Sequence, residues 1–556
     1  MQTKSMNQFQ YRIAIIGNEN QPDLRFDESQ MKALKRLGFN MIQLNIAWGS
    51  RPADEALNLE DVVVEDGEPA GRVKERFDEL RRRAIVCKKH GFRTLFHFGA
   101  PHIEKLYLKI NKPAEIDAAT SENAVQKAQI RNKYKRLLLR LADSIPEIDD
   151  IMMYNFDQEA WIGNEFGNDP AARAIPMHER LPGFVTHICD VWRSRRPEGM
   201  LWWEPWEMSA GQIFAMADRL PDRNFGFMLH SNICEVKLIR PVDQWLKCMS
   251  VIAAKRNIPL IVECFFSSAH QDTSVLTDVA TPQLIHNQFK VLEQLPHISG
   301  VKEYFGFVPD KFDPNLEMAR LLLSGKSIPM DKALAKISNA YGEAADAVRK
   351  AWEESSSGFL SLPWDLSWYA TMFCLPSKTV YHGWSAFNQI GFCAESPAWR
   401  ATRMGFYMIN KDETDLHPWV IEDVGLRYQR AADCFEKADF HYGAALKSAS
   451  PEMREFLERN RHDMVVLAVR CRDQSLHALE TNAALNIRRY LDDGMQVPVH
   501  CYDRLEGYLQ ADVINRQRGI LKEENKPGAE EMLAAFHCNP DEWVRTHLLI
   551  EKPGEK

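Results

Sequence analysis

The sequence predicts an α/β protein, a (β/α)8 TIM barrel followed by a mainly α-helical C-terminal domain. Eight short apolar segments alternate with amphipathic helical patterns over the first ~300 residues, as this barrel requires. Polar and aromatic residues gather where these segments end, and long helical patterns fill most of the remaining chain. The alternation predicts the fold, and the segment ends predict where its site lies.

Each of the eight predicted strands is a short apolar run bounded by polar or turn-forming residues. In order along the chain they are residues 12–19, 40–49, 93–102, 148–159, 200–207, 224–232, 259–266 and 300–307. Helical patterns, with apolar residues three and four apart, lie between several of them. These helices are predicted at 28–39, 73–92, 128–147, 178–197 and 242–257.

The last third of the chain has a different pattern. Residues 312–359 are strongly helical, and residues 420–520 predict two or three long helices. Between them, residues 360–410 are rich in Trp, Phe, Tyr, Pro and Gly, which is typical of a loop-rich segment that could border the barrel mouth. We therefore expect a barrel domain over 10–315 and a mainly helical domain over 316–556.

Composition and missing motifs exclude several functions. The chain is 45% apolar and 26% charged with a formal charge of -8 and no long basic run, so we expect neither a nucleic acid nor a membrane as partner. Its 11 cysteines form no C-x-x-C pair, which disfavours a zinc ribbon or redox dithiol. Phosphate-loop, dinucleotide and nucleophile-elbow motifs are missing, and Pro182 interrupts the H-E-x-x-H pattern that starts at His178. We expect no cofactor and no metal.

The N-terminus has no apolar leader followed by a small-residue cleavage site, and the chain has no apolar run of 18 residues. These observations lead us to expect a cytoplasmic protein. The sequence leaves open whether the protein forms a homo-oligomer.

Two carboxylates stand out at the end of the fourth strand. Asp157 and Glu159 end the segment MMYNFDQEAW, where a buried strand normally carries apolar groups. Alternation predicts that they share a face with Asn155, toward the barrel axis, while Met152 and Tyr154 pack against the helices. Because the two residues are separated by roughly 6.6 Å along the strand, both could serve one substrate. Like charges so placed also raise one pKa, which suits a general acid.

Other strand ends supply further candidates. Glu204, Glu263 and Glu303 each follow apolar runs that would bury them, and alternation sends Lys302 to the face opposite Glu303. These glutamates are therefore candidates for the site at the C-terminal mouth, where barrel enzymes hold their active sites.

Histidine, amide and aromatic side chains complete the predicted site. Asn45, Trp48, His97, His230 and Tyr304 also lie at strand ends, and His102 follows the third strand. The histidines could bind a hydroxyl-rich ligand or be buried core residues. Trp202, Glu204 and Trp206 share one strand face, where indole rings can stack on sugars.

Taken together, these residues resemble a glycoside hydrolase. The D-x-E of Asp157, Gln158 and Glu159 resembles the acid-bearing fourth strand of several barrel glycosidases. The segment YGEAADAVRKAWEESSSGF after strand eight is similar to those of barrel glycosidases with a C-terminal helical domain, among them families 20, 67, 84 and 89. The resemblance implies that Glu159 protonates the leaving group.

The partner of Glu159 stays open in this resemblance. In retaining enzymes of the strand-four and strand-seven type, Glu263 would be the nucleophile about 5.5 Å from Glu159, although those enzymes usually have Asn where this chain has Gln158. In substrate-assisted enzymes, Asp157 would orient an acetamido group of the sugar. An inverting enzyme would need a base such as Glu19, Glu204 or Glu303 about 6.5 to 9.5 Å away.

We expect a carbohydrate substrate, with a terminal sugar cleaved from a small oligosaccharide or glycoside. Two alternatives remain. Glu204, His230, Glu263 and Glu303 could bind Mn²⁺ or Mg²⁺, as in barrel sugar isomerases. The barrel could also be a non-catalytic carbohydrate-binding scaffold.

Overall fold

A computed structural model describes most of the chain. The described residues are 9–17, 25–47, 54–104, 112–157, 160–162, 173, 175–205, 208, 210–230, 242, 244–264, 266, 276, 279–303, 306–325, 327–362, 418–520 and 528–547. Within them, no helix is both long enough and apolar enough to cross a membrane.

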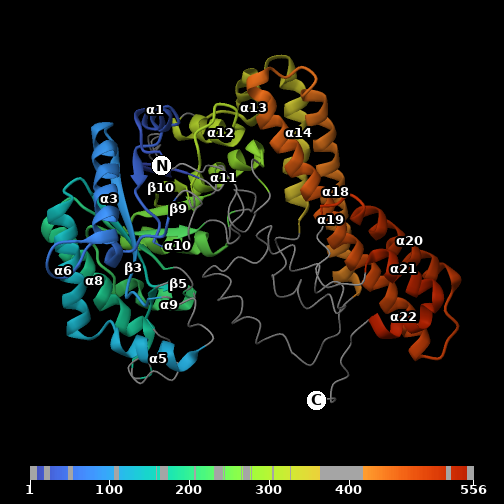
Figure 1. The fold of residues 1–556 in the computed structure, drawn as a ribbon, viewed down its shortest axis with the longest axis horizontal. Helices are drawn as coiled ribbons and strands as arrows, with labels where there is room; N and C mark the ends of the chain where they lie inside the picture. The colour runs from blue at the N-terminus through green and yellow to red at the C-terminus, as the bar shows by residue number, and fades with distance from the viewer. Residues whose placement is uncertain are drawn as a thin grey trace.

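The N-terminal part is a closed barrel of eight parallel strands, so the predicted fold class is confirmed (Figure 1). The strands are β1 (Tyr11–Ile15), β2 (Met41–Gln43), β3 (Arg93–Gly99), β4 (Asp150–Tyr154), β7 (Leu201–Glu204), β8 (Phe225–His230), β9 (Leu260–Cys264) and β10 (Ile298–Glu303). They neighbour one another in chain order, and β1 closes the barrel on β10. All eight fall within or beside the segments predicted as strands.

Helices cover the outside of this barrel (Figure 1). They are α1 (Glu28–Arg36), α2 (Leu59–Val62), α3 (Gly71–Lys89), α5 (Pro113–Glu122), α6 (Ala128–Ser144), α8 (Met177–Arg195), α9 (Ala210–Met216), α10 (Gln244–Arg256), α11 (Pro282–Gln294) and α12 (Pro314–Leu323). Side-chain caps help to start two of them. Asp27 accepts from the Gln30 amide at 2.9 Å before α1, and Asp313 accepts from the Asn315 amide at 2.8 Å before α12.

One layer of apolar side chains fills the barrel interior. It contains Ile13, Met41, Leu95, Met152, Trp202, Met228 and Ile261, one from each of seven strands. Trp202 is the largest of them, and a Cβ added at Gly226 on the next strand would overlap its ring. Tyr11 packs edge-on against Trp202 with ring centroids 4.8 Å apart. The indole therefore fills space that a larger residue at position 226 would need.

The facing predicted for the fourth strand is wrong. Met152 lies in the barrel interior, whereas Met153 belongs to the core between the barrel and its helices. Tyr154 packs with Ile46, Ala47 and Ala160 rather than with the helices. Both faces of a parallel barrel strand are buried, so an apolar run does not reveal which face points inward.

A small hairpin continues the chain after β4. Its strands β5 (Phe156–Asp157) and β6 (Ala160–Trp161) pair antiparallel with each other, in a sheet separate from the barrel. A bridge between His102 and Ala160 joins the hairpin to the chain after β3. Asn155 donates to the carbonyl of Ala100 and accepts from Trp203 Nε1 at 2.7 Å, so it is oriented by the protein rather than lying with Asp157 on one continuous strand face.

The C-terminal part is helical, as predicted (Figure 1). Its helices are α13 (Met330–Ser338), α14 (Ala345–Ser361), α18 (Pro418–Ala445), α19 (Pro451–Asp492), α20 (Val499–Arg516), α21 (Ala529–Cys538) and α22 (Pro540–His547). The long helices α14, α18 and α19 run side by side, with Phe359 packed edge-on against Phe435 at 5.0 Å. The predicted boundary at 315–316 falls inside α12, which contacts the barrel helix α11. The predicted loop-rich segment lies largely outside the described residues.

Candidate active site

An imidazole, two carboxylates and an ammonium group lie directly above the apolar interior. His97, Glu204 and Glu263 each lie two residues after a member of that layer, and Lys302 lies two residues after Gly300. Because side chains alternate along a strand, all four face the barrel axis, toward its C-terminal end. Each is at most 2% exposed, so the barrel holds a buried polar layer where this fold keeps its active sites.

Asn45 fixes the backbone of this layer between β2 and β3. Its side-chain oxygen accepts from the His97 amide at 2.9 Å, and its nitrogen donates to the His97 carbonyl at 2.7 Å. The same nitrogen donates to the Leu57 carbonyl at 2.8 Å. The residue predicted to bind substrate is thus engaged in holding the neighbouring strand.

The imidazole of His97 has protein groups at both nitrogens. The Ala47 amide donates to Nδ1 at 3.2 Å, and Nε2 faces Glu204 Oε2 at 3.5 Å, the outer limit of hydrogen-bonding distance. Because Nδ1 accepts a hydrogen bond, a neutral ring carries its proton on Nε2, the nitrogen nearer to the carboxylate. Burial lowers the pKa of His97, and Glu204 opposes that effect only in part.

Glu263 has a different partner. Lys302 Nζ lies 2.6 Å from Glu263 Oε1, and each residue is 1% exposed. The next-to-last residues of β9 and β10 thereby place a buried ion pair at the axis. Such a pair is retained in a low-dielectric interior only with close geometry, and removing one member leaves a charge that is costly to bury.

Glu303 does not join this layer. It follows Lys302 on β10, on the face of Val301, and its Oε2 accepts from the Phe266 amide at 2.9 Å. Of the four metal ligands that the isomerase alternative needs, Glu303 therefore lies on the wrong face of its strand. Lys302, which the sequence analysis did not select, takes its place beside Glu263.

Several predicted site residues fall outside the described residues. These are Glu19, Trp48, Glu159, Trp206 and Tyr304; for Asp157 and His230 the backbone is described but not the side chain. Trp202 is described, but it is fully buried beneath the polar layer and cannot stack on a sugar. After each barrel strand, the described part of the chain ends at once or within a few residues.

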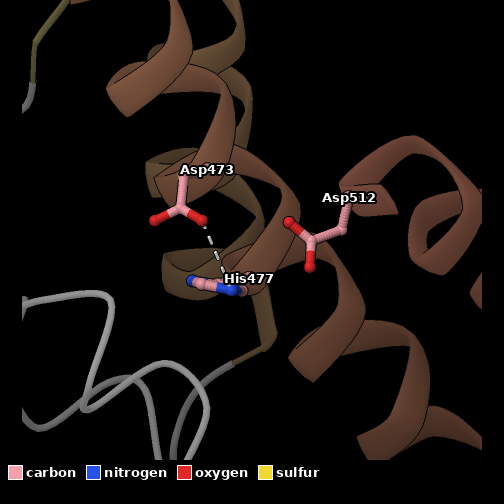
Figure 2. Close-up of side chains that lie close together, drawn as sticks. All are labelled: Asp473, His477 and Asp512. Atoms are coloured by element: carbon pink, nitrogen blue, oxygen red, sulfur yellow. Dashed lines mark ion pairs between the residues drawn. The ribbon is translucent and has the colours of Figure 1, made fainter. Parts of the chain in front are cut away.

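A second polar cluster lies in the helical part (Figure 2). Asp473 and His477 of α19 face Asp512 of α20, and one ligand atom from each lies within 4.8 Å of the others. Arg516 donates to the same three groups, to Asp512 Oδ2 at 2.8 Å and to Asp473 Oδ1 and His477 Nε2 at 3.2 Å each. A guanidinium therefore already supplies the positive charge that a metal ion would bring.

Comparison with known proteins supports the fold. A GH138 enzyme targeting pectin rhamnogalacturonan II matches with a TM-score of 0.56 and 12% identity, over 96% of this chain and 67% of that chain. An endo-beta-mannanase/endo-beta-glucanase of Prevotella bryantii matches at 0.37 and 11% identity, over 58% of this chain and 49% of its own. The first match shows a shared fold, and the second is too distant to carry an argument.

No model of a known family matches the chain, and no curated protein matches it.

Proposed function

We propose that this protein is a glycoside hydrolase that acts by carboxylate catalysis. The observation that carries the proposal is the buried layer of Glu204, Glu263, His97 and Lys302 at the C-terminal end of a closed (β/α)8 barrel. Glycoside hydrolysis needs two carboxylic groups across one bond and no cofactor. The fold shared with a GH138 enzyme is compatible with this chemistry.

Within this proposal, Glu263 is the nucleophile. Its position near the end of the seventh barrel strand, as the anionic member of an ion pair with Lys302, suits a carboxylate that attacks an anomeric carbon. Lys302 keeps the carboxylate oriented from the neighbouring strand. When the sugar ester forms at Glu263, the ammonium group loses its anionic partner, which favours return to the carboxylate by hydrolysis.

Glu159 is the proposed acid/base, with Asp157 beside it in sequence. Asp157 ends the hairpin strand β5, Glu159 directly precedes β6 in the sequence, and the bridge from His102 to Ala160 joins that hairpin to the chain after β3. The proposed reaction removes a terminal sugar from a small oligosaccharide or glycoside. In a retaining enzyme, the carboxyl groups of Glu159 and Glu263 would stand about 5.5 Å apart.

A screen of aryl glycosides tests this function with the wild-type protein, Glu159→Gln and Glu263→Gln in parallel. We expect Glu263→Gln to abolish turnover of every substrate, because the covalent step needs the carboxylate. In Glu159→Gln, sugar transfer to the enzyme should slow far more for poor leaving groups than for activated ones, since protonation assists only departure of a basic oxygen.

A wild-type protein that cleaves none of the glycosides contradicts the proposal. Equal losses for good and poor leaving groups in Glu159→Gln would contradict the acid role alone. Activity that appears only after Mn²⁺ or Mg²⁺ is added, with ketose products, would support the isomerase alternative instead.

A further inference from the structure

We propose that Gln43 is a specificity-determining residue whose side-chain oxygen accepts a hydrogen bond from a hydroxyl group of the bound sugar. This inference rests on the proposed glycosidase function and names a substrate contact that neither the nucleophile nor the acid supplies. Gln43 was not among the residues selected from the sequence, because it lies inside the apolar run of the second strand rather than at a polar end.

Gln43 faces the same part of the barrel axis as the buried polar layer. It ends β2 and lies two residues after Met41, which is part of the apolar interior. Because side chains alternate along a strand, its amide points to the axis toward the C-terminal end, as do the side chains of Glu263 and Lys302. Gln43 is 1% exposed, the same value as Glu263. A sugar bound against the proposed nucleophile would therefore lie level with Gln43.

One hydrogen bond fixes which way the amide of Gln43 points. Its nitrogen Nε2 donates to the carbonyl of Asn45 at 2.7 Å. A carbonyl oxygen can only accept, so exchanging the oxygen and nitrogen of the amide would bring two acceptors together. The Asn45 backbone is held in turn, because its side chain hydrogen-bonds both backbone groups of His97. Oε1 is thus the atom left for a ligand, and its direction is set before the ligand arrives.

The oxygen Oε1 of Gln43 is a buried acceptor to which no group in the described part of the chain donates. An amide oxygen removed from water without a donor destabilises a folded protein, so such atoms are rare in protein interiors. An apolar side chain of the same length would fill this position without leaving an oxygen unpaired. A binding role explains why the chain has an amide here, because a ligand that donates to Oε1 restores the missing hydrogen bond.

The chemistry of this oxygen restricts what it can recognise. Because the nitrogen already donates to the protein, Gln43 offers the sugar an acceptor and no donor. A hydroxyl group can donate to Oε1, whereas a methyl ether, a bare methylene or a carboxylate cannot. We therefore expect the site to reject sugars that are methylated, deoxygenated or oxidised to an acid at the position that faces Gln43.

Deoxy substrates test this contact during turnover. Gln43→Met removes the acceptor and keeps the length of the side chain. On an aryl glycoside that the wild type cleaves, we expect this variant to lose about 10- to 100-fold in kcat/KM, because a buried hydroxyl is left unpaired. Among analogues that each lack one hydroxyl, one should cost the wild type a similar factor and cost Gln43→Met little more. Losses that multiply at every position of the sugar would overturn the proposal.

The stability of the same variant distinguishes binding from a structural role. Gln43→Met leaves the Asn45 carbonyl without a donor but also removes an unpaired oxygen, so its melting temperature should change little. The matched control is Asn315→Leu. Asn315 is also 1% exposed, but its amide accepts from Thr281 N and donates to Val279 O at 2.8 Å each, so the control should melt several degrees lower.

An equal fall in both variants would overturn the proposal. It would mean that Gln43 Oε1 already has a partner in the free protein, such as a buried water molecule, and that the residue serves the fold.

Sugar binding without turnover keeps this inference apart from the proposed function. Glucose, galactose, mannose, rhamnose and galacturonic acid are each added in excess to the wild type and to Gln43→Met, and the rise in melting temperature reports binding. We expect at least one sugar to stabilise the wild type clearly more than the variant. Equal stabilisation of both proteins, or none with any sugar, would overturn the proposal. Binding that needs Gln43 in a protein that cleaves no glycoside would contradict only the proposed hydrolase function.

Discussion

At the scale of single residues, the barrel gives the buried carboxylates of Glu204 and Glu263 different neighbours. Glu263 pairs with an ammonium group, and Glu204 faces an imidazole whose proton is directed by a backbone amide. Because both lie where water has little access, the partner rather than solvent determines how each carboxylate behaves. The stability of the barrel is therefore coupled to residues that the proposed chemistry needs.

Replacing Lys302 with Met tests this coupling directly. The substitution leaves Glu263 buried without its cation, so we expect the free energy of unfolding to fall by about 3–5 kcal/mol. Urea denaturation measures the change. The double variant Lys302→Met with Glu263→Gln, which removes both charges, should recover part of the loss. A Lys302→Met protein as stable as the wild type would show that the ion pair is not maintained in solution.

The pH dependence of stability reports on His97. Its pKa is lowered in the folded protein by burial, so the unfolded chain binds a proton more readily than the folded one. The contribution of neutral His97 to the free energy of unfolding is fully present above the pKa of about 6.5 that the residue has in the unfolded chain. This contribution is lost as the pH falls below about 6.5 toward the lower pKa of the folded protein. We expect His97→Gln to show a shallower loss of unfolding free energy between neutral and mildly acidic pH. Identical pH profiles for variant and wild type would contradict this.

At the scale of elements, the hairpin of β5 and β6 depends on close packing at the end of β3. A Cβ built at Gly99 would lie 2.7 Å from Ala160 Cβ of β6 and 2.7 Å from the Tyr154 hydroxyl oxygen. Asn58 adds to this junction by donating to the Gly99 carbonyl at 3.1 Å and accepting from its amide at 2.8 Å. Third strand, fourth strand and hairpin are thus in contact at one glycine.

Gly99→Ala should therefore displace the hairpin or Tyr154. We expect it to lower the free energy of unfolding by about 1–3 kcal/mol, as overpacked sites do, and to reduce glycosidase activity because the proposed acid directly precedes β6 in the sequence. The matched control is Gly507→Ala in α20, where an added Cβ meets nothing within 4 Å. That variant should gain up to about 1 kcal/mol by helix propensity. Equal stability of the two variants would contradict this account of Gly99.

The contact of α19 with α20 depends on a buried charge network. Arg516 contacts Asp473, His477 and Asp512, and it is the cation that these acceptors share. Its side chain is 11% exposed, in contrast to Arg518, which is 35% exposed and pairs with Glu436 on the surface. The two arginines thus offer a buried and an exposed ion pair on neighbouring stretches of chain.

Arg516→Met should destabilise the protein by about 3–5 kcal/mol, because two buried carboxylates lose their cation. Arg518→Met should change stability by at most about 1 kcal/mol, as surface pairs do. Thermal or urea unfolding compares the two. The same comparison is made with Zn²⁺ added. A clear rise in the melting temperature of the wild type, equal to the rise for Arg516→Met, would mean that the cluster binds metal with the arginine in place and would contradict our interpretation.

At the scale of the whole molecule, periodicity predicted the architecture well. All eight barrel strands and the three long helices of the C-terminal part match segments seen in the sequence, because each element buries a continuous apolar face. It was harder to predict which residues of a strand point into the barrel and which point toward the helices. Met152 and Met153 are both apolar and both buried, and only the closed sheet decides that the first lies inside the barrel.

The sequence selected His97, Glu204 and Glu263 as candidates, since an acid or imidazole after an apolar run needs a reason to be buried, and the structure places all three in one buried layer; their role stays a prediction. Lys302 and the Ala47 amide were missed, because their partners come from strands and loops tens of residues away. Asp473 and Arg516 were missed for the same reason, lying on separate helices of an ordinary amphipathic pattern.

The packing of Trp202 against Gly226 has a consequence for how the chain can evolve. Enlarging position 226 alone brings new atoms into the indole, and shrinking position 202 alone opens a void on the barrel axis. Either substitution alone should therefore destabilise the barrel, whereas the two substitutions together could be tolerated. Descendants of this sequence are therefore expected to inherit the tryptophan and the glycine as a pair or to exchange both.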